Sequence, residues 1–168
     1  MEALLFRDAS SLVKRYVPEM GSPTVGAVFA QATVGMATSY WGYLETFSIL
    51  VRRLNGHVID EATFTDSVSA LQSEVLQRFA LLGIDDPIVL KSQVAVRKHN
   101  LNATDAAIVT MLLEVGADPE EELLPVLIAS DRRLLRAAEA EGLLTFNPEE
   151  QTPGDVTAFL ATVAIAVL

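Results

Sequence analysis

Short apolar runs alternate along the chain with longer segments that repeat apolar residues at helical spacing. We expect strands at the apolar runs, which are residues 3–7, 34–38, 125–129 and 143–146. The run "PVLIA" at 125–129 is the clearest, because a strand buried on both faces is apolar throughout. Such alternation of strands and helices is typical of an α/β domain with a largely parallel sheet.

Apolar residues spaced three and four apart predict helices in the segments between these strands. The expected helices span residues 9–17, 39–55, 60–82, 88–97 and 103–115, with two more after Pro23 and after Asp131. Three of these helices are expected to end at a proline or glycine, since these residues terminate helices: Pro18, Gly83 and Gly142.

The C-terminal segment at residues 156–168, "VTAFLATVAIAVL", is strongly apolar. It is shorter than the roughly 20 residues that span a bilayer, so we expect a docked helix and no membrane span. The chain is therefore divided into a main domain over residues 1–148 and a C-terminal apolar extension over 149–168. Apolar residues expected at the surface also favour a homodimer, with packing of this run on its own domain as the alternative.

The composition fits one well-packed domain, because 51% of the 168 residues are hydrophobic and 20% are charged. The chain contains no cysteine, which excludes thiolate metal sites, and it begins without the pattern of a signal peptide. We therefore expect a cytoplasmic protein. Twelve basic against 22 acidic residues give a net charge of -10, so binding of a polyanion would require local compensation.

Four acidic residues occupy the expected starts of elements or the apolar faces of helices. They are Asp8, Glu45, Asp105 and Asp131. Asp8 and Asp131 each follow an expected strand, and the carboxyl ends of parallel strands meet at one edge of a sheet. Because ligands of α/β domains bind at that edge, we expect the four carboxylates to converge there.

Each of these acids also has a purely structural interpretation. Asp8 and Asp131 are suited to cap the helices that follow them. Asp105 can form a variant of the capping box with Asn102, three residues earlier. Glu45 can pair with an arginine further along its helix or face solvent.

A cluster of four acids favours a divalent cation, because carboxylates that are buried together repel one another and resist ionisation unless a cation neutralises them. Oxygen ligands suit Mg²⁺ or Mn²⁺ better than zinc. The two histidines, His57 and His99, stand alone in the sequence, and we expect neither to bind a metal.

Four segments together resemble the motifs of the PIN-domain family, and most closely those of VapC-like toxins of toxin–antitoxin pairs. In chain order they are "LLFRDASSLVKRYVPE", "TSYWGYLETFSIL", "LNATDAAIVTMLL" and "PVLIASDRRLLRAAEAEGLLTFNP". Their order and spacing match the family across about residues 3–148. Family members often carry a hydroxyl two residues before the last Asp, where this chain has Ala129 with Ser130 beside it.

The resemblance implies a PIN-like three-layer α/β/α fold with a central, mainly parallel sheet, and a nuclease domain over residues 1–148. It also implies metal-dependent hydrolysis of RNA by an endoribonuclease, with Mg²⁺ or Mn²⁺ as cofactor and a small antitoxin protein as partner. The residues it assigns to metal binding and catalysis are Asp8, Glu45, Asp105 and Asp131, and the supporting hydroxyls are Ser10 and Ser130.

Basic residues that follow two of these acids are candidates for contacts with flanking phosphates. They are Lys14, Arg15, Arg132 and Arg133. Two other functions stay open: a PIN-like module that binds a partner protein without cleaving RNA, and a phosphatase with Asp8 as nucleophile. Such phosphatases usually place a second Asp two residues later, where this chain has Ser10, which disfavours them. Arg7 has no role in any of these schemes.

Overall fold

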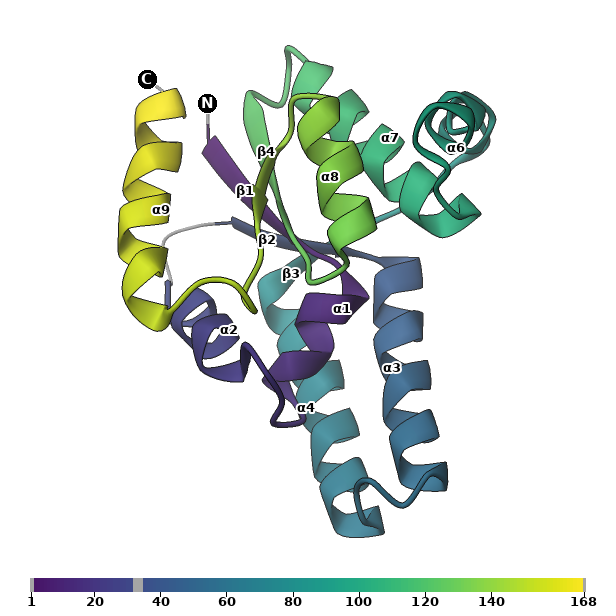
Figure 1. Ribbon diagram of the computed structural model, residues 1–168, viewed down its shortest axis with the longest axis vertical. Coiled ribbons are helices and arrows are strands. Elements are labelled where there is room, and N and C mark those ends of the chain that lie inside the picture. Colours follow the sequence, from purple (N-terminus) through teal and green to yellow (C-terminus); the bar gives the residue numbers. More distant parts are fainter. Residues whose placement is uncertain (1, 32–34, 168) are drawn as a thin grey trace.

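The structure is a computed structural model that describes residues 2–31 and 35–167. Its centre is a parallel sheet in the order β3-β2-β1-β4-β5 (Figure 1). The strands are β1 (Glu2–Arg7), β2 (Gly35–Ser39), β3 (Phe79–Leu82), β4 (Leu123–Ile128) and β5 (Leu144–Phe146). The last four residues of both β1 and β4 are buried, as expected for strands at the centre of a covered sheet.

Helices cover both faces of the sheet (Figure 1). They are α1 (Ala9–Leu12), continued by a 3-10 turn (Val13–Arg15), α2 (Ser22–Phe29), α3 (Tyr40–Asn55), α4 (Glu61–Arg78), α5 (Asp86–Lys91), α6 (Gln93–His99), α7 (Ala103–Ala117), α8 (Arg132–Ala140) and α9 (Pro153–Val167).

Successive side chains of β1 point to opposite faces of the sheet and so enter different cores. Phe6 packs in the core that the sheet shares with α7 and α8. Leu5 packs in the core that the sheet shares with α2 and α9. A third apolar cluster, which includes Leu50 and Leu71, joins α1 and α2 to α3 and α4. The result is a three-layer α/β/α arrangement.

The helices α3 and α4 run side by side and extend beyond the sheet (Figure 1). Asp60 caps α4, because its carboxylate accepts a hydrogen bond of 2.8 Å from the backbone N–H of Thr63. The rings of Phe47 and Phe64, which lie 6.2 Å apart, pack the two helices against each other.

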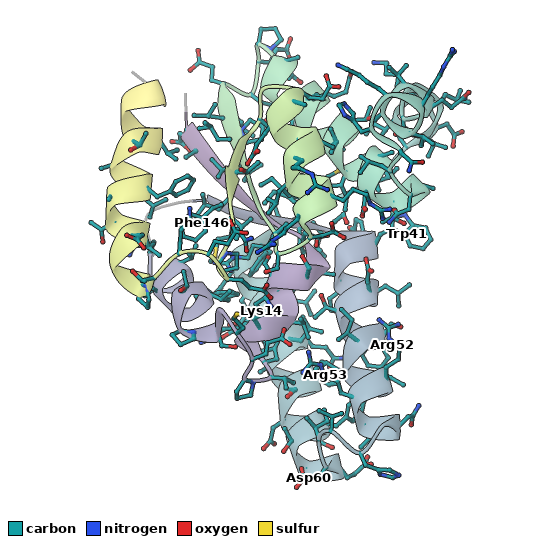
Figure 2. The ribbon with its side chains drawn as sticks, in the orientation of Figure 1. Lys14, Trp41, Arg52, Arg53, Asp60 and Phe146 are labelled. Atoms are coloured by element: carbon teal, nitrogen blue, oxygen red, sulfur yellow. The ribbon has the colours of Figure 1, made fainter. Side chains whose placement is uncertain are left out.

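The helix α9 packs against α2 and β1, on the side of the domain opposite α3 (Figure 1). Val156 and Val163 are each only 1% exposed. The ring of Phe159 lies 4.7 Å from that of Phe146, which is at the end of β5 (Figure 2). The extension thus packs on the chain's own sheet. Among the described residues, no helix is long and apolar enough to cross a membrane.

The prediction of one helix over residues 60–82 is wrong at its C-terminal end. The helix α4 ends at Arg78, and Phe79–Leu82 forms the edge strand β3 beside β2. Phe79 and Leu81 pack against the cluster between α3 and α4. A run of four mostly apolar residues suits either a helix or a strand, so pairing with the edge of β2 decides the outcome.

Other boundaries differ by smaller amounts. The helix predicted over 88–97 is two short helices that meet at Ser92, whose hydroxyl donates a hydrogen bond of 2.6 Å to the carbonyl of Ile88. The strand β4 begins early, at Leu123, because its first residues pair with the start of β1. Residue 34, predicted to begin β2, lies outside the described residues.

Candidate active site

Four acidic side chains lie near the carboxyl ends of the central strands. Asp8 directly follows β1, and Asp131 follows β4 and precedes α8. Glu45 lies in the second turn of α3, a helix that starts where β2 ends. Asp105 lies in the first turn of α7. Parallel strands therefore deliver three of the four acids, and a helix start supplies the fourth.

Asp8 is buried at the start of α1, with only 6% of its surface exposed. Its Oδ2 atom accepts hydrogen bonds from the backbone N–H of Ser10, at 2.9 Å, and from the Ser10 hydroxyl. Asp8 is thus a helix cap, as one interpretation of the sequence predicted. These hydrogen bonds use one of its two oxygens, so capping is compatible with a second role for the carboxylate.

Ser10 connects the ends of the two central strands. Its hydroxyl accepts a hydrogen bond of 2.9 Å from the backbone N–H of Ser130, beyond the end of β4. The hydroxyl of Ser11 adds a bond of 2.7 Å to the carbonyl of Ile128. The hydroxyl of Ser130 is buried and has no hydrogen-bond partner among the described residues. The hydroxyl oxygens of Ser10 and Ser130 therefore lie beside the acids that follow β1 and β4.

Asp131 and Asp105 are both held by hydrogen bonds at helix starts. The Oδ1 atom of Asp131 accepts from the backbone N–H groups of Arg133 and Leu134, at 2.8 and 3.2 Å. Asn102 donates to Asp105 at 2.9 Å and accepts from its backbone N–H at 2.8 Å. Asn102 thus caps α7, but the predicted capping box forms only in part, because Asp105 accepts from the side-chain amide of Asn102 and not from its backbone N–H. The hydrogen bond from this amide also orients the Asp105 carboxylate.

Glu45 is exposed on α3, and close packing at the start of that helix sets its position. Ser39 caps α3 by accepting a bond of 2.8 Å from the backbone N–H of Gly42. A side chain at Gly42 would place its Cβ 2.7 Å from the hydroxyl of Thr38. Only glycine therefore lets α3 start this close to the end of β2.

The four acids influence one another electrostatically. Burial raises the pKa of Asp105 to about 6, and the charges of Asp8 and Asp131 add to the rise. Burial also raises the pKa of Asp8, with a further contribution from Asp131. Glu45 is exposed as a residue, but partial burial of its carboxylate and then the charge of Asp8 raise its pKa. These mutual effects indicate that the four carboxylates share one neighbourhood.

Within the described residues, no three Asp, Glu or His side chains form a group that could hold a metal ion as they stand. Carboxylates without a cation repel one another, which opposes such a group. The donors nevertheless fit Mg²⁺ or Mn²⁺, because they are hard oxygen atoms that include the unpartnered hydroxyl of Ser130. Metal binding by the four acids stays a prediction.

Two of the four predicted phosphate contacts are directed elsewhere. The ammonium of Lys14 is 2.6 Å from Glu149 and 3.3 Å from Glu19, and the side chain is only 5% exposed (Figure 2). The prediction for Lys14 is therefore wrong, because a buried and ion-paired ammonium does not reach a substrate. Arg15 forms an ion pair of 2.7 Å with Glu74 of α4, which turns it toward that helix.

The other two candidates lie in the first turn of α8. The Nη2 atom of Arg133 is 3.8 Å from Asp105 Oδ2, and the charge of Arg133 opposes the rise in the pKa of Asp105. Arg132 is more exposed and pairs with Glu150 at 3.0 Å. Arg133 therefore directly adjoins one of the acids, Asp105. Its contact with phosphate stays a prediction.

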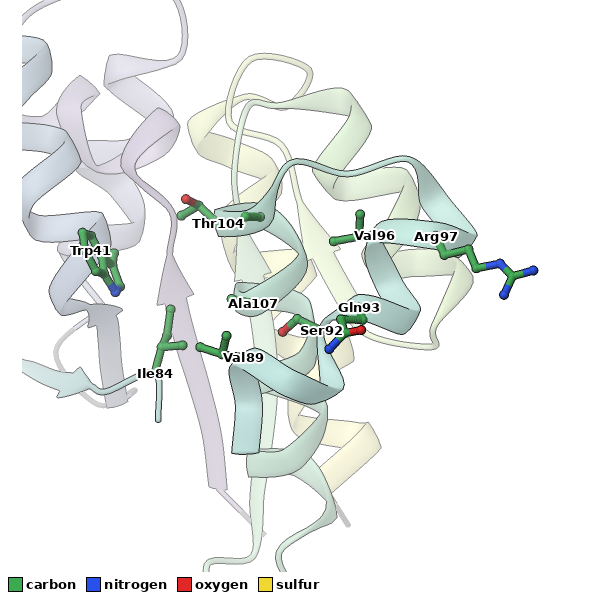
Figure 3. A pocket seen from close by; sticks show the side chains of 10 residues that line it. Trp41, Ile84, Val89, Ser92, Gln93, Val96, Arg97, Thr104 and Ala107 are labelled. Carbon is green, nitrogen blue, oxygen red and sulfur yellow. The ribbon is translucent and has the colours of Figure 1, made fainter. Parts of the chain in front are cut away.

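An apolar pocket beside the acids was not predicted. It has a volume of about 420 Å³ and lies between Trp41 at the start of α3 and the helices α5, α6 and α7 (Figure 3). The sequence does not indicate this pocket, because Trp41 has the same helical spacing as the buried residues of α3 and so resembles a core residue. Only the fold shows that Trp41 is 56% exposed.

Comparisons with known proteins identify the fold. No protein-family model matches the sequence, and no curated protein matches it. Solved structures do resemble it. VapC20 of Mycobacterium tuberculosis, described as a sarcin-ricin loop cleaving toxin, has a TM-score of 0.61 at 14% identity, over 83% of this chain and 96% of that chain.

Two further structures have the same arrangement. PAE2754 of Pyrobaculum aerophilum has a TM-score of 0.61 at 16% identity, over 98% of this chain and 99% of that chain. FitAcB of Neisseria gonorrhoeae has a TM-score of 0.54 at 16% identity, over 86% and 97%. These likenesses show that the chain has the three-layer fold of PIN-domain proteins, and they confirm the predicted fold class.

Proposed function

We propose that the protein is a metal-dependent endoribonuclease and the toxin of a toxin–antitoxin pair. The observation that carries this proposal is the set of four acids at the carboxyl ends of the strands, where burial and then neighbouring carboxylate charges raise the pKa values of Asp8, Glu45 and Asp105. Structural likeness to a toxin described as cleaving the sarcin-ricin loop supports the same function. The cofactor we propose is Mg²⁺ or Mn²⁺.

The residues that would hold the cation are Asp8, Glu45, Asp105 and Asp131. Three of them are already oriented by hydrogen bonds at helix starts, which reduces the entropy lost when a cation binds. A bound Mg²⁺ or Mn²⁺ lowers the pKa of a water and offsets the charge that develops on the leaving oxygen. Ser10 supports the set by fixing Asp8 to the end of β4.

Substrate binding requires local attraction, because the net charge of -10 repels a polyanion. Arg133 adjoins Asp105 and is half exposed, so we assign it a contact with a phosphate that flanks the cleaved bond. Arg132 is exposed in the same helical turn and is a second candidate. Lys14 and Arg15 are not part of this surface.

Two further proposals concern partners. We propose that a small antitoxin protein covers the acids, and that the chain forms a homodimer. Exposed apolar side chains support the existence of a protein partner, since Leu76 and Val94 are among the large hydrophobic residues at the surface. The C-terminal helix is not part of this argument, because Val156 and Val163 are buried against the chain's own core.

The decisive experiment measures cleavage of RNA by the purified protein with Mg²⁺ or Mn²⁺, and again with a chelator. We expect cleavage only with the cation. Asp105→Asn should lower kcat/KM by roughly 100-fold or more, the loss typical of removing a group that stabilises developing charge. Asp66→Asn, an exposed position on α4, is the matched control and should retain full activity.

Circular dichroism checks that each variant remains folded. Full activity in chelator, or in folded Asp105→Asn, would contradict the proposal. A wild-type protein that cleaves no RNA but binds a small basic protein tightly would favour the alternative of a binding module.

A further inference from the structure

The apolar pocket has one aromatic wall and one aliphatic wall. Trp41 stands on one side, and Val89 of α5 faces it across the opening (Figure 3). Ala107 and Thr104 of α7 line the pocket between them. Arg97 points away from the opening (Figure 3). No acidic side chain among the described residues lines the pocket, and Arg97 is its one charged lining residue in that part of the chain, so the space offered to a ligand is mainly apolar.

The pocket lies next to two acids of the candidate active site, Glu45 and Asp105. Trp41 precedes Glu45 by four residues on α3, so the two side chains are neighbours on one face of the helix. Thr104 directly precedes Asp105 at the start of α7. The same two helix starts therefore present carboxylates on one side and the pocket on the other. A molecule held by the acids would extend naturally into this space.

The exposure of Trp41 is unusual for such a large apolar side chain. With 56% of its surface exposed, Trp41 leaves its indole ring accessible in the pocket. Stacking of a nucleobase on an aromatic side chain contributes roughly 1–3 kcal/mol per base. The volume of about 420 Å³ lies in the range of small-ligand sites, roughly 300–1,000 Å³, and exceeds what a single side chain fills.

Polar groups at the edge of the pocket offer hydrogen bonds to a base. The hydroxyl of Thr104 and the carboxamide of Gln93 line it, and no hydrogen bond to another described residue engages either side chain. The hydroxyl of Ser92 is already bonded to the carbonyl of Ile88. A base needs an apolar surface for its faces and a few polar atoms for its edge, and the pocket supplies both.

We propose that this pocket is a subsite for one unpaired nucleobase of the RNA substrate, stacked on Trp41 next to the cleaved phosphodiester. The inference rests on the proposed ribonuclease function and names the form of its substrate. A base in a duplex is stacked between its neighbours and cannot enter the pocket. The substrate is therefore single-stranded RNA or an unpaired loop.

A base fits the pocket better than an apolar helix of a partner protein does. A bound helix needs a row of apolar anchors along a groove. The exposed Leu90 and Val94 lie on the adjoining helices α5 and α6, but they do not line the pocket. The pocket is instead a single space enclosed by Trp41, α5, α6 and α7, next to the helix starts that carry Glu45 and Asp105.

The test uses Trp41 as its own probe, because it is the single tryptophan of the chain. All proteins carry Asp105→Asn so that the RNA stays intact. A short single-stranded oligoadenylate should quench the tryptophan emission, since stacking brings a base against the indole. A ribose-phosphate chain of the same length without bases should leave the emission unchanged.

Binding of labelled RNA, followed by fluorescence anisotropy, tests the energetic role of Trp41. Trp41→Ala should weaken binding by roughly 10-fold, which is the lower part of the stacking range. Trp41→Phe should recover part of the loss, because a ring is restored. Leu44→Ala is the matched control: Leu44 is also exposed on α3 but does not line the pocket, so its removal should leave affinity unchanged.

Three results would overturn the inference: emission that RNA does not change, equal losses for Trp41→Ala and Leu44→Ala, or quenching by a partner protein that RNA cannot reproduce. The last would assign the pocket to protein binding. None of these depends on cleavage. A protein that cleaves RNA with a cation but shows no quenching would retain the proposed function and lose this subsite. If RNA quenches the emission but the wild type cleaves no RNA, the pocket still binds a base and the proposed ribonuclease function is wrong.

Discussion

Arg7 is the least expected residue of the molecule, because its guanidinium is buried and its nitrogen atoms have no hydrogen-bond partner among the described residues. Burial lowers its pKa to about 9. The guanidinium lies 4.0 Å from the centre of the Phe29 ring, and this contact between cation and ring stabilises the charge. Arg15 and Arg78 approach the same ring, so the cation is also repelled by its neighbours.

Replacing Arg7 with methionine should stabilise the protein. The cation is charged in both the folded and the unfolded state near neutral pH, so folding bears the cost of transferring it out of water. We expect Arg7→Met to raise the free energy of unfolding by about 1 kcal/mol or more, measured by urea denaturation. Arg136→Met, at an exposed position on α8, is the control and should change it by less than about 0.5 kcal/mol. Destabilisation by Arg7→Met would show that the contact with Phe29 outweighs the transfer cost.

At the scale of single residues, the sequence predicted the helix caps of the candidate site well, while their role in metal binding stays a prediction. Asp8 and Asp131 form the predicted caps, and Asp105 forms the predicted pair with Asn102. These are local patterns, since a cap and its helix are only a few residues apart. The contacts of Lys14 were not predictable, because Glu149 is 135 residues away in the chain.

Among the elements, α9 contributes to the core although it follows the region that resembles the PIN family. Its buried residues close the face of the sheet formed by Leu5 and Val126, next to α2. Buried apolar surface stabilises by roughly 25 cal/mol per Å², so this helix adds to the stability of the whole domain. Its apolar sequence is explained by this packing.

Truncation of a buried side chain in α9 should therefore destabilise the protein without affecting RNA cleavage. We expect Val156→Ala to lower the free energy of unfolding by about 2 kcal/mol, because it leaves a cavity against the sheet. Thr157→Ala, one position later and exposed, should have little effect. Chemical denaturation measures both changes. An equal and small effect of the two substitutions would mean that α9 is not firmly docked.

Elements with long apolar patterns were predicted more reliably than short ones. The central strands β1 and β4 were found because each contains a run of apolar residues, most of them buried, as expected for a strand covered on both faces. The edge strand β3 was missed, because its four residues continue the apolar pattern of α4. Hydrogen bonds to β2 stabilise it as a strand, and those are tertiary contacts.

For the molecule as a whole, the gathered acids make stability depend on pH and on a cation. Folding raises the pKa of Asp105 to about 6 from its ordinary value of 3.8. The folded state therefore binds more protons than the unfolded state between these values. The metal-free protein accordingly loses stability as the pH rises through about 6, and the proposed cation, by neutralising the acids, would restore it.

Addition of Mn²⁺ should raise the melting temperature by a few degrees at about pH 7.5 and by less at about pH 5, because protons compete for the Asp105 carboxylate at low pH. Differential scanning fluorimetry at both pH values measures the shift. In Asp105→Asn the shift should be small at either pH. A shift that is independent of pH, or unchanged in the variant, would mean that Mn²⁺ binds elsewhere.

The sequence by itself determined the alternation of strands and helices, the fold class and the positions of the four acids, because each depends on periodicity, capping or spacing along the chain. Tertiary structure alone decided which side chains meet: the Ser10 bridge between strand ends, the burial of Arg7 and Lys14, the strand β3 and the pocket beside Trp41. The physical reason is that burial and charge coupling arise between segments far apart in sequence. Local patterns carry no record of such neighbours.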